Sequence, residues 1–155
     1  EHLFRRNKAM NYEIYTDGSC RGNPGPGGWG VLIKNMDTGG EEILRGGTPK
    51  STNNIMELTA VIRALGEFAG NSEDPPNLTI YSDSKYVVKG ATEWLPGWIK
   101  SNFKGKKNVE LWKKFLKESD GINIDFKWVK AHNGHPENEL VDSIAFEEAS
   151  KYRKY

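Results

Sequence analysis

Four acidic residues of this chain occupy positions where an acid is unusual. Two follow short apolar runs of strand composition and two interrupt apolar patterns of helical spacing: Asp17 and Asp83, then Glu57 and Asp142. If the two runs form neighbouring strands, Asp17 and Asp83 stand side by side, where their charges repel unless they share a cation. Carboxylate oxygens suit Mg²⁺ or Mn²⁺. Two such ions about 4 Å apart can activate a water and stabilise the leaving oxygen in phosphodiester cleavage.

Each acid also has an ordinary explanation when it is taken singly. Asp17 and Gly18 form a turn sequence, and Asp83 can cap the helix that follows it. Glu57 and Asp142 can be solvent-facing helix charges. The four acids together, with an adjacent Asn pair and a loop His, favour a shared site, but their spacing does not identify a substrate.

Three short motifs match known sites without the context that those sites need. Residues 25–30 (GPGGWG) have the dinucleotide-binding spacing, yet a β-rich run follows where a helix is required. Residues 82–85 (SDSK) match S-x-x-K, but neither S-D-N nor K-T-G occurs in the chain. His132 and His135 have the spacing of half a zinc site, but no cysteine lies near them. None of the three motifs is assigned a function.

Length and charge are those of one globular domain with a basic segment. The chain has 155 residues, with 22 Lys and Arg against 21 Asp and Glu. Between Lys85 and Lys117 there are nine Lys and two acids, a net charge of +7 in one segment. This segment is either a footprint for a polyanion or a solvated, Lys-rich helical face.

The composition also limits the class of protein. No apolar run approaches the ~20 residues that cross a membrane, and the first ten residues have no signal-peptide core. The one cysteine, Cys20, cannot form an internal disulfide, which fits a reducing compartment. We therefore expect a cytoplasmic protein that does not act at a membrane. No exposed apolar stripe stands out, so we expect a monomer without an obligate protein partner.

Strands and helices alternate along the chain and must position the acids. Strand composition occurs at 12–16, 29–33, 41–45, 78–81 and 122–129. Helices are expected to begin near Ser51 or Thr52, Ser84, Val109 and Glu137. Residues 18–30 are expected to contain a long Gly- and Pro-rich loop, and Pro96-Gly97 is expected to interrupt the second helix. The order predicts one α/β domain with a mixed sheet that opens with an antiparallel meander.

Five sequence blocks, in this order, resemble type 1 ribonuclease H. They are YTDGS at 15–19, NPG at 23–25, TNN-x-MEL at 52–58, SDS at 82–84 and WVK-x-H-x-GH-x-x-NE-x-x-D at 128–142. The resemblance implies a ribonuclease H-like α/β fold with a mixed five-stranded sheet in the order 3-2-1-4-5 and helices on both faces. It places one domain at residues 11–155, after an extension or added sequence at residues 1–10.

The resemblance implies hydrolysis of the RNA strand of an RNA–DNA hybrid, giving 5′-phosphate and 3′-hydroxyl ends. It assigns two Mg²⁺ ions, for which Mn²⁺ can substitute, to the four carboxylates of Asp17, Glu57, Asp83 and Asp142. His132 matches a histidine that assists proton transfer or product release, and imidazoles suit that task near neutral pH. Glu139 matches a further acid sometimes linked to product release.

The resemblance also implies contacts to each strand of the hybrid. Three residues match the family positions that contact RNA 2′-hydroxyls in the minor groove: Asn23, Asn53 and Asn54. Backbone groups near Cys20 are expected to assist them. Thr52, at a helix start, matches part of the family's pocket for a DNA phosphate. Lys50 belongs to the same pocket and replaces the usual Arg, so it keeps the charge but cannot form the bidentate contact of a guanidinium.

A basic handle that grips the hybrid corresponds to residues 94–107. Trp94 and Trp98 match aromatic residues along the DNA channel, and Lys104, Lys106 and Lys107 match the basic grip. The handle is shorter than is usual in the family, with Ile99, Ser101 and Phe103 in place of some of its Lys and Arg. We therefore expect a weaker phosphate grip and a smaller salt dependence than in the family at large.

Three alternatives use the same resemblance. The first is a module that binds hybrids without cleaving them, which the four acids oppose because clustered negative charge repels phosphate. The second is another nuclease or a transposase of the same fold, and such relatives share scattered acids but lack the block from His132 to Asp142 and the paired Asn53 and Asn54. The third is a domain cut from a reverse transcriptase, which a full set of landmarks in 155 residues disfavours.

Overall fold

A computed structural model describes residues 9–70 and 74–152 of the chain. The elements are β1 (Asn11–Cys20), β2 (Gly25–Asn35), β3 (Glu41–Ser51), α1 (Asn53–Gly66), β4 (Asn77–Ser82), α2 (Lys85–Lys89), the π-helical turn η2 (Gly90–Trp94), α3 (Leu95–Lys100), α4 (Val109–Ser119), β5 (Asn123–Trp128) and α5 (Pro136–Ser150). The extension expected at residues 1–10 lies outside the described residues, apart from Ala9 and Met10. No helix in the described ranges is long and apolar enough to cross a membrane.

The five strands form one mixed sheet in the order β3-β2-β1-β4-β5, which confirms the predicted topology. Neighbours among β1, β2 and β3 pair antiparallel, as a meander requires. β4 pairs parallel with β1 on one side and with β5 on the other. Tyr15 is paired with Tyr81, so Asp17 and Asp83 both lie two residues beyond the same register position. The second half of β1 and the residue that follows β4 therefore bring both acids to one edge of the sheet.

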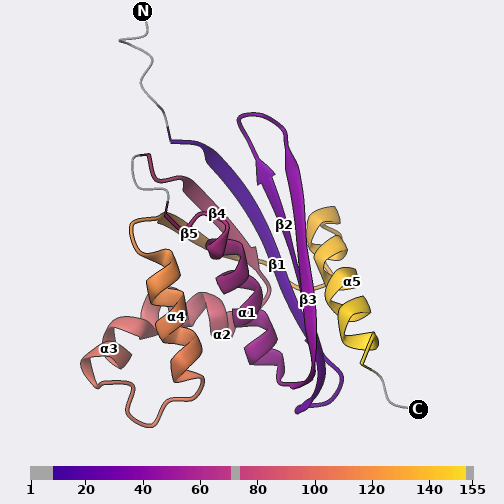
Figure 1. Ribbon diagram of the computed structural model, residues 1–155, viewed down its shortest axis with the longest axis vertical. Coiled ribbons are helices and arrows are strands. Elements are labelled where there is room, and N and C mark those ends of the chain that lie inside the picture. The colour runs from indigo at the N-terminus through magenta and orange to yellow at the C-terminus, as the bar shows by residue number, and fades with distance from the viewer. Residues whose placement is uncertain (1–8, 71–73, 153–155) are drawn as a thin grey trace, which may run out of the picture.

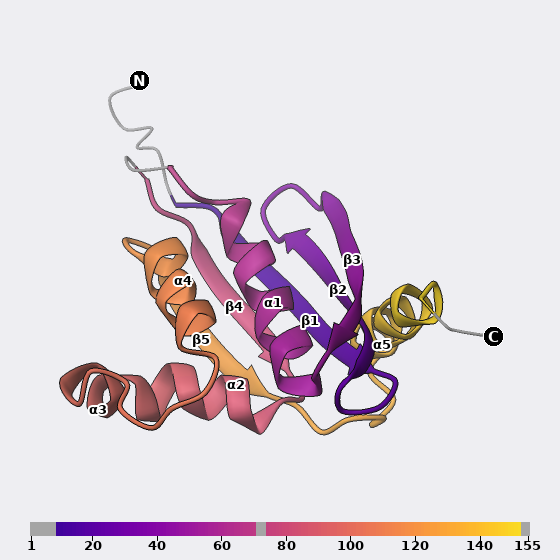
Figure 2. The same ribbon diagram turned by 60° about the horizontal axis from the view of Figure 1, so that its bottom comes forward.

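Helices cover both faces of the sheet, also as predicted. Figures 1 and 2 show α1 and α4 against one face and α5 against the other. The larger core lies on the α1 and α4 face and includes the fully buried Leu58 and Ile80. A smaller core on the α5 face includes Leu32 and Val141. Burial of each such side chain stabilises the fold by about 1.5–3 kcal/mol, so both helix layers hold the sheet edge in place.

The first two strands are longer than the sequence predicts, and the expected loop at 18–30 is wrong. β1 continues through Asp17 to Cys20, and Gly18 pairs with Trp29 of β2, which leaves only residues 21–24 between the strands. Gly18 permits close packing and does not mark a turn, whereas Gly22, with a φ of 98°, lies in the short connection. A Cβ at Gly18 would lie 2.4 Å from the backbone nitrogen of Glu57 in α1.

The expected interruption at Pro96-Gly97 is also wrong. Pro96 occupies the first turn of α3, where a missing N–H costs no hydrogen bond. The chain passes from α2 to α3 through η2, whose first residue, Gly90, packs against the Trp112 ring. A Cβ at Gly90 would lie 2.5 Å from that ring. The three short segments therefore run on as one helical stretch that carries the handle.

Candidate active site

Elements from four parts of the chain converge at one edge of the sheet. Figure 2 shows the end of β4, the start of α1 and the segment between β5 and α5 meeting near the end of β1. α1 begins there because Thr52 is its N-cap, with its hydroxyl accepting a 3.3 Å hydrogen bond from the Ile55 N–H. The convergence brings residues far apart in sequence into one site.

Three of the predicted acids form a compact cluster. One carboxylate oxygen from each of Asp17, Glu57 and Asp83 lies within 4.8 Å of the others. The backbone N–H of Gly18 donates at 3.0 Å to Asp17 Oδ1 and at 3.0 Å to Glu57 Oε1, which holds these two side chains next to one another. Asp17 is only 4% exposed. One buried and two half-buried acids at this spacing offer the oxygen ligands that suit a hard divalent cation.

The electrostatics of the cluster show the cost of leaving it without a cation. Burial, the charge of Asp83 and a side-chain hydrogen bond with Asp142 together raise the pKa of Asp17 to about 9. Burial and the charges of Asp17 and Asp83 raise the pKa of Glu57 well above its ordinary value. The protein therefore disfavours ionisation of both Asp17 and Glu57, and a divalent cation would offset that repulsion. The donor set fits a metal site.

The fourth acid and the histidine border the same cluster. Asp142 projects from α5 and lines the same cleft as Asp17 and Asp83. A single cleft is lined by Asp17, Asp83 and Asp142 together with His132, Asn138 and Glu139. His132 is exposed on the loop between β5 and α5, with a positive φ of 54°. The cleft thus combines the acids with an exposed imidazole.

The polar residues expected to contact RNA gather at the start of α1. Asn53 donates its backbone N–H to Asn23 Oδ1 at 3.0 Å, which joins the 21–24 turn to the helix. The Cys20 thiol contacts the carbonyl oxygens of Gly25 at 3.2 Å and Ser51 at 3.1 Å, so it is turned inward. Asn54 and Lys50 are exposed on either side of Thr52. The sequence prediction that these residues share one region is consistent with this arrangement.

The basic handle stands apart from the acids. Figure 1 shows α3 and its following loop projecting from the body beside α4. Trp94 is 39% exposed and its ring centroid lies 5.8 Å from that of half-buried Trp98. Lys106 lies over the Trp98 ring at 5.5 Å. Lys104 and Lys107 are exposed on the same loop.

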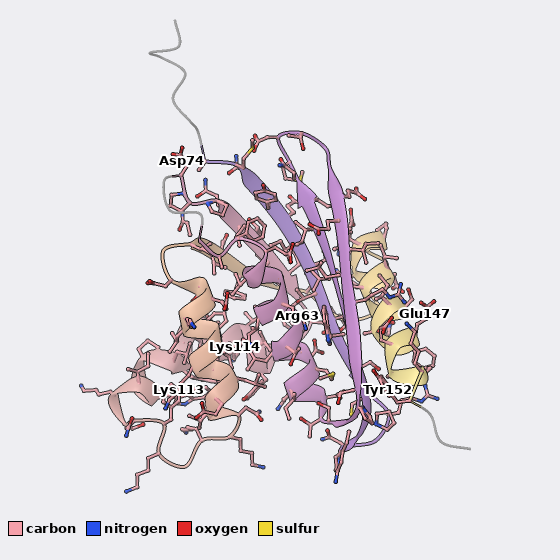
Figure 3. All side chains as sticks on the ribbon, in the orientation of Figure 1. Arg63, Asp74, Lys113, Lys114, Glu147 and Tyr152 are labelled. Atoms are coloured by element: carbon pink, nitrogen blue, oxygen red, sulfur yellow. The ribbon has the colours of Figure 1, made fainter. Side chains whose placement is uncertain are left out.

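Phe103 has a role that its residue type alone did not predict. The sequence comparison treats it as a lost cation, but the structure buries it to 8% exposure in the main core. Lys113 of α4 lies over its ring at 5.9 Å (Figure 3). Phe103 therefore anchors the short handle loop to the body.

Trp128 begins the 128–142 block, but it is not predicted from the sequence as a site residue. Its indole N–H donates at 3.0 Å to the main-chain oxygen of Asp83. This contact depends on the pairing of β4 with β5, so the sequence gives no direct signal for it. Lys130 also lines the cleft and lies in the same motif.

Comparison with known proteins gives a consistent result. The RNase H family model matches residues 9–150. The chain is 50% identical over 139 residues to a ribonuclease H of Polaromonas, covering 85% of this chain and 84% of that protein. It is 48% identical over 142 residues to a ribonuclease H of Helicobacter acinonychis, covering 92% and 95%.

Solved structures resemble the chain over nearly its whole length. LC9-RNase H1, a type 1 enzyme with the type 2 active-site motif, superposes with a TM-score of 0.84 at 30% identity, covering 96% of this chain and 76% of that one. LC11-RNase H1, solved in complex with an RNA/DNA hybrid, gives 0.68 at 26% identity, covering 90% and 97%.

Proposed function

The chain belongs to the ribonuclease H family and acts on RNA–DNA hybrids, and from this premise we propose that it cleaves the RNA strand at the Asp17, Glu57, Asp83 and Asp142 carboxylates by two-metal-ion hydrolysis. The products would be 5′-phosphate and 3′-hydroxyl ends. The observation that carries the proposal is the convergence of three carboxylate oxygens within 4.8 Å. A protein that only binds polyanions gains nothing from such a cluster, because the acids repel phosphate.

The four carboxylates would hold two Mg²⁺ ions. When bound, the ions would ease deprotonation of the attacking water and stabilise charge on the leaving oxygen. The Gly18 N–H donates to one carboxylate oxygen of Asp17 and to one of Glu57, which orients both side chains. The second oxygen of each carboxylate would bind metal. Asp83 and Asp142 close the cluster from β4 and α5.

His132 would move a proton at the edge of the site. Its imidazole lies in the same cleft as the acids but on an exposed loop, where it can exchange protons with solvent. We expect His132→Ala to lower kcat by about 10²-fold while the metal affinity stays unchanged. His135→Ala is the matched control, because His135 is exposed at the α5 N-cap and makes no side-chain cap hydrogen bond. Equal kcat values for both variants would remove His132 from the mechanism.

The Asn residues at the start of α1 would select RNA by its 2′-hydroxyls. Asn53 and Asn54 are exposed, and their amides can both donate to and accept from a hydroxyl. Asn23 is held against Asn53 by a hydrogen bond, which places a third amide on the same surface. DNA phosphate would bind near Thr52 and Lys50 at the start of α1, although the Asn53 and Ile55 N–H groups there already donate to Asn23 and Thr52.

The proposed substrate selectivity is tested with one end-labelled RNA strand in three settings: paired with DNA, paired with RNA, and single-stranded. Each setting is measured with Mg²⁺ and with EDTA. We expect cleavage of the hybrid alone, and only with metal. Cleavage of all three RNAs would contradict hybrid selectivity, and tight hybrid binding without cleavage would instead favour a binding module.

The handle would contribute affinity through its lysines. We expect the triple change Lys104→Ala, Lys106→Ala and Lys107→Ala to raise KM about 10-fold at 0.1 M salt and to reduce the salt slope of binding by about 2–3. The value of kcat should stay unchanged because the handle lies away from the acids.

A second triple variant removes the same charge from α4, at Lys113, Lys114 and Lys117, two of which are labelled in Figure 3. We expect it to affect KM less than the handle variant. An equal effect of the two variants would mean that net charge, and not the handle, sets the affinity.

A further inference from the structure

The backbone of Asp83 is held by a side chain from the neighbouring strand. Trp128 is the last residue of β5 and is paired with Ser82, the last residue of β4. Its indole Nε1–H reaches past this pair and donates at 3.0 Å to the main-chain oxygen of Asp83. A 3.0 Å indole bond has normal hydrogen-bond length. The acid and the indole are therefore linked across the sheet at the edge of the cleft.

The residues on both sides of Asp83 are fixed independently. The carbonyl of Ser82 accepts from the Val129 N–H at 2.9 Å, and the Ser82 hydroxyl accepts from the Ser84 N–H at 3.0 Å. Ser84 in turn caps α2 by accepting from the Val87 N–H at 3.1 Å. Between these fixed points, the peptide that follows Asp83 is oriented by the Trp128 indole. Rotation of that peptide would tilt the Asp83 side chain relative to Asp17 and Glu57.

The indole itself is restrained on its outer side. Trp128 is 45% exposed. Lys85, the first residue of α2, places its Nζ over the ring at 5.0 Å from the centroid. A cation over the face of a Trp ring is attracted by the negative charge of the ring face. The contact favours the ring orientation in which Nε1 points at Asp83.

We propose that Trp128 is a positioning residue for Asp83: its indole N–H fixes the peptide after Asp83, so that the carboxylate is held at the correct place to bind metal with Asp17 and Glu57. The inference rests on the proposed function, because it takes Asp83 as a metal-binding residue. Residues that orient metal ligands commonly change metal affinity when they are replaced. Trp128 acts through Asp83 and does not itself contact the reacting atoms.

The test replaces Trp128 by Phe, which keeps an aromatic face for Lys85 and removes the N–H donor together with the pyrrole part of the indole. Binding of Mn²⁺ to the protein alone is measured by calorimetry and by the metal-induced rise in Tm. Hybrid cleavage is measured as a function of Mg²⁺ concentration. We expect the metal Kd and the half-saturating Mg²⁺ concentration to rise about 10-fold. KM for the hybrid at saturating Mg²⁺ should change by less than about twofold, since no substrate contact is lost.

Trp112→Phe is the matched control. It removes an indole hydrogen bond of similar length, 2.8 Å to the Tyr86 hydroxyl, from the core between α2 and α4. It should lower Tm without a change in metal affinity. A Trp128→Phe variant that loses Tm but keeps wild-type metal affinity would overturn the inference and leave Trp128 a structural residue.

The two proposals fail in different ways. If the wild-type protein neither binds Mn²⁺ nor cleaves the hybrid, the proposed function fails and the inference fails with it. If the wild-type protein does both and Trp128→Phe has the same Mg²⁺ dependence, only the inference fails. A 10-fold rise in the metal Kd and in the half-saturating Mg²⁺ concentration for Trp128→Phe, with none for Trp112→Phe, supports both proposals.

Discussion

Replacement of Asp17 by Asn is expected to lower kcat on the hybrid by at least about 10³-fold and, in EDTA, to make the protein more stable. Activity is lost because Asn removes the most buried carboxylate of the cluster. Stability is gained because the variant no longer holds a buried acid beside Asp83 and Glu57. We expect the free energy of unfolding at pH 7 to rise by about 2 kcal/mol, which corresponds to about 6 °C in Tm for a domain of this size.

The stability gained by Asp17→Asn is expected to depend on pH, in a direction set by the raised pKa of Asp17. The pKa of Asp17 is raised from 3.8 to about 9 in the folded protein, so the unfolded chain ionises first as the pH rises. The stability associated with protonated Asp17 is therefore fully present below about pH 4 and is lost as the pH approaches 9. The advantage of Asp17→Asn in EDTA should grow across this window.

Thermal denaturation at several pH values between 4 and 9, with and without Mg²⁺, measures this effect. Asp74→Asn is the control, because Asp74 precedes β4 at the other end of the sheet (Figure 3). A constant difference in Tm at all pH values would contradict the electrostatic explanation. Mg²⁺ should stabilise the wild-type protein more than Asp17→Asn, since only the wild type keeps the full cluster.

Replacement of Gly18 by Ala is expected to cost both stability and activity. An added Cβ would lie 2.4 Å from the Glu57 backbone nitrogen and 2.5 Å from the Met56 carbonyl carbon, so it would push α1 away from β1. We expect a loss of about 3 kcal/mol in the free energy of unfolding. Because the same shift separates Glu57 from Asp17, kcat should fall by about 10²-fold in the fraction that remains folded.

The control for this change is Gly66→Ala on the last turn of α1. A Cβ there would meet only the Glu118 carboxylate oxygen, at 3.9 Å, so neither stability nor kcat should fall. Chemical denaturation and single-turnover cleavage on the same samples separate the two effects. A Gly18→Ala protein that is destabilised but has wild-type kcat would show that close contact between β1 and α1 does not position Glu57.

The sheet order and the position of the acids at strand ends could be predicted because they depend on local pattern and on the family resemblance. Asp83 directly follows the apolar run of β4, and that boundary was predicted to within one residue. Asp17 was expected to end β1, but the strand continues to Cys20. Glycine is depleted in strands, so Gly18 favoured a turn. Its true role, to let α1 approach β1, depends on a helix 39 residues away.

The roles of the aromatic residues near the site could not be predicted in this way. Phe103 looked like a missing cation, whereas it is buried under the handle. Trp128 was expected only as one position of the 128–142 block, whereas its indole donates to the Asp83 main-chain oxygen across two paired strands. In both cases the function of the side chain depends on which distant residue it contacts, and residue type and spacing do not contain that information.

The central claim, that four carboxylates from β1, α1, β4 and α5 form one metal site, is tested most directly by locating the metal. Crystals of the wild-type protein soaked in Mn²⁺ would be measured for anomalous scattering. The account predicts the strongest peak among the carboxylates of Asp17, Glu57 and Asp83, beside Asp142, at about 2.0–2.4 Å from the ligating oxygens. Loss of that peak in Asp17→Asn crystals would show that the Asp17 carboxylate is needed to bind the metal. A strongest peak elsewhere, with none among these acids, would contradict the account.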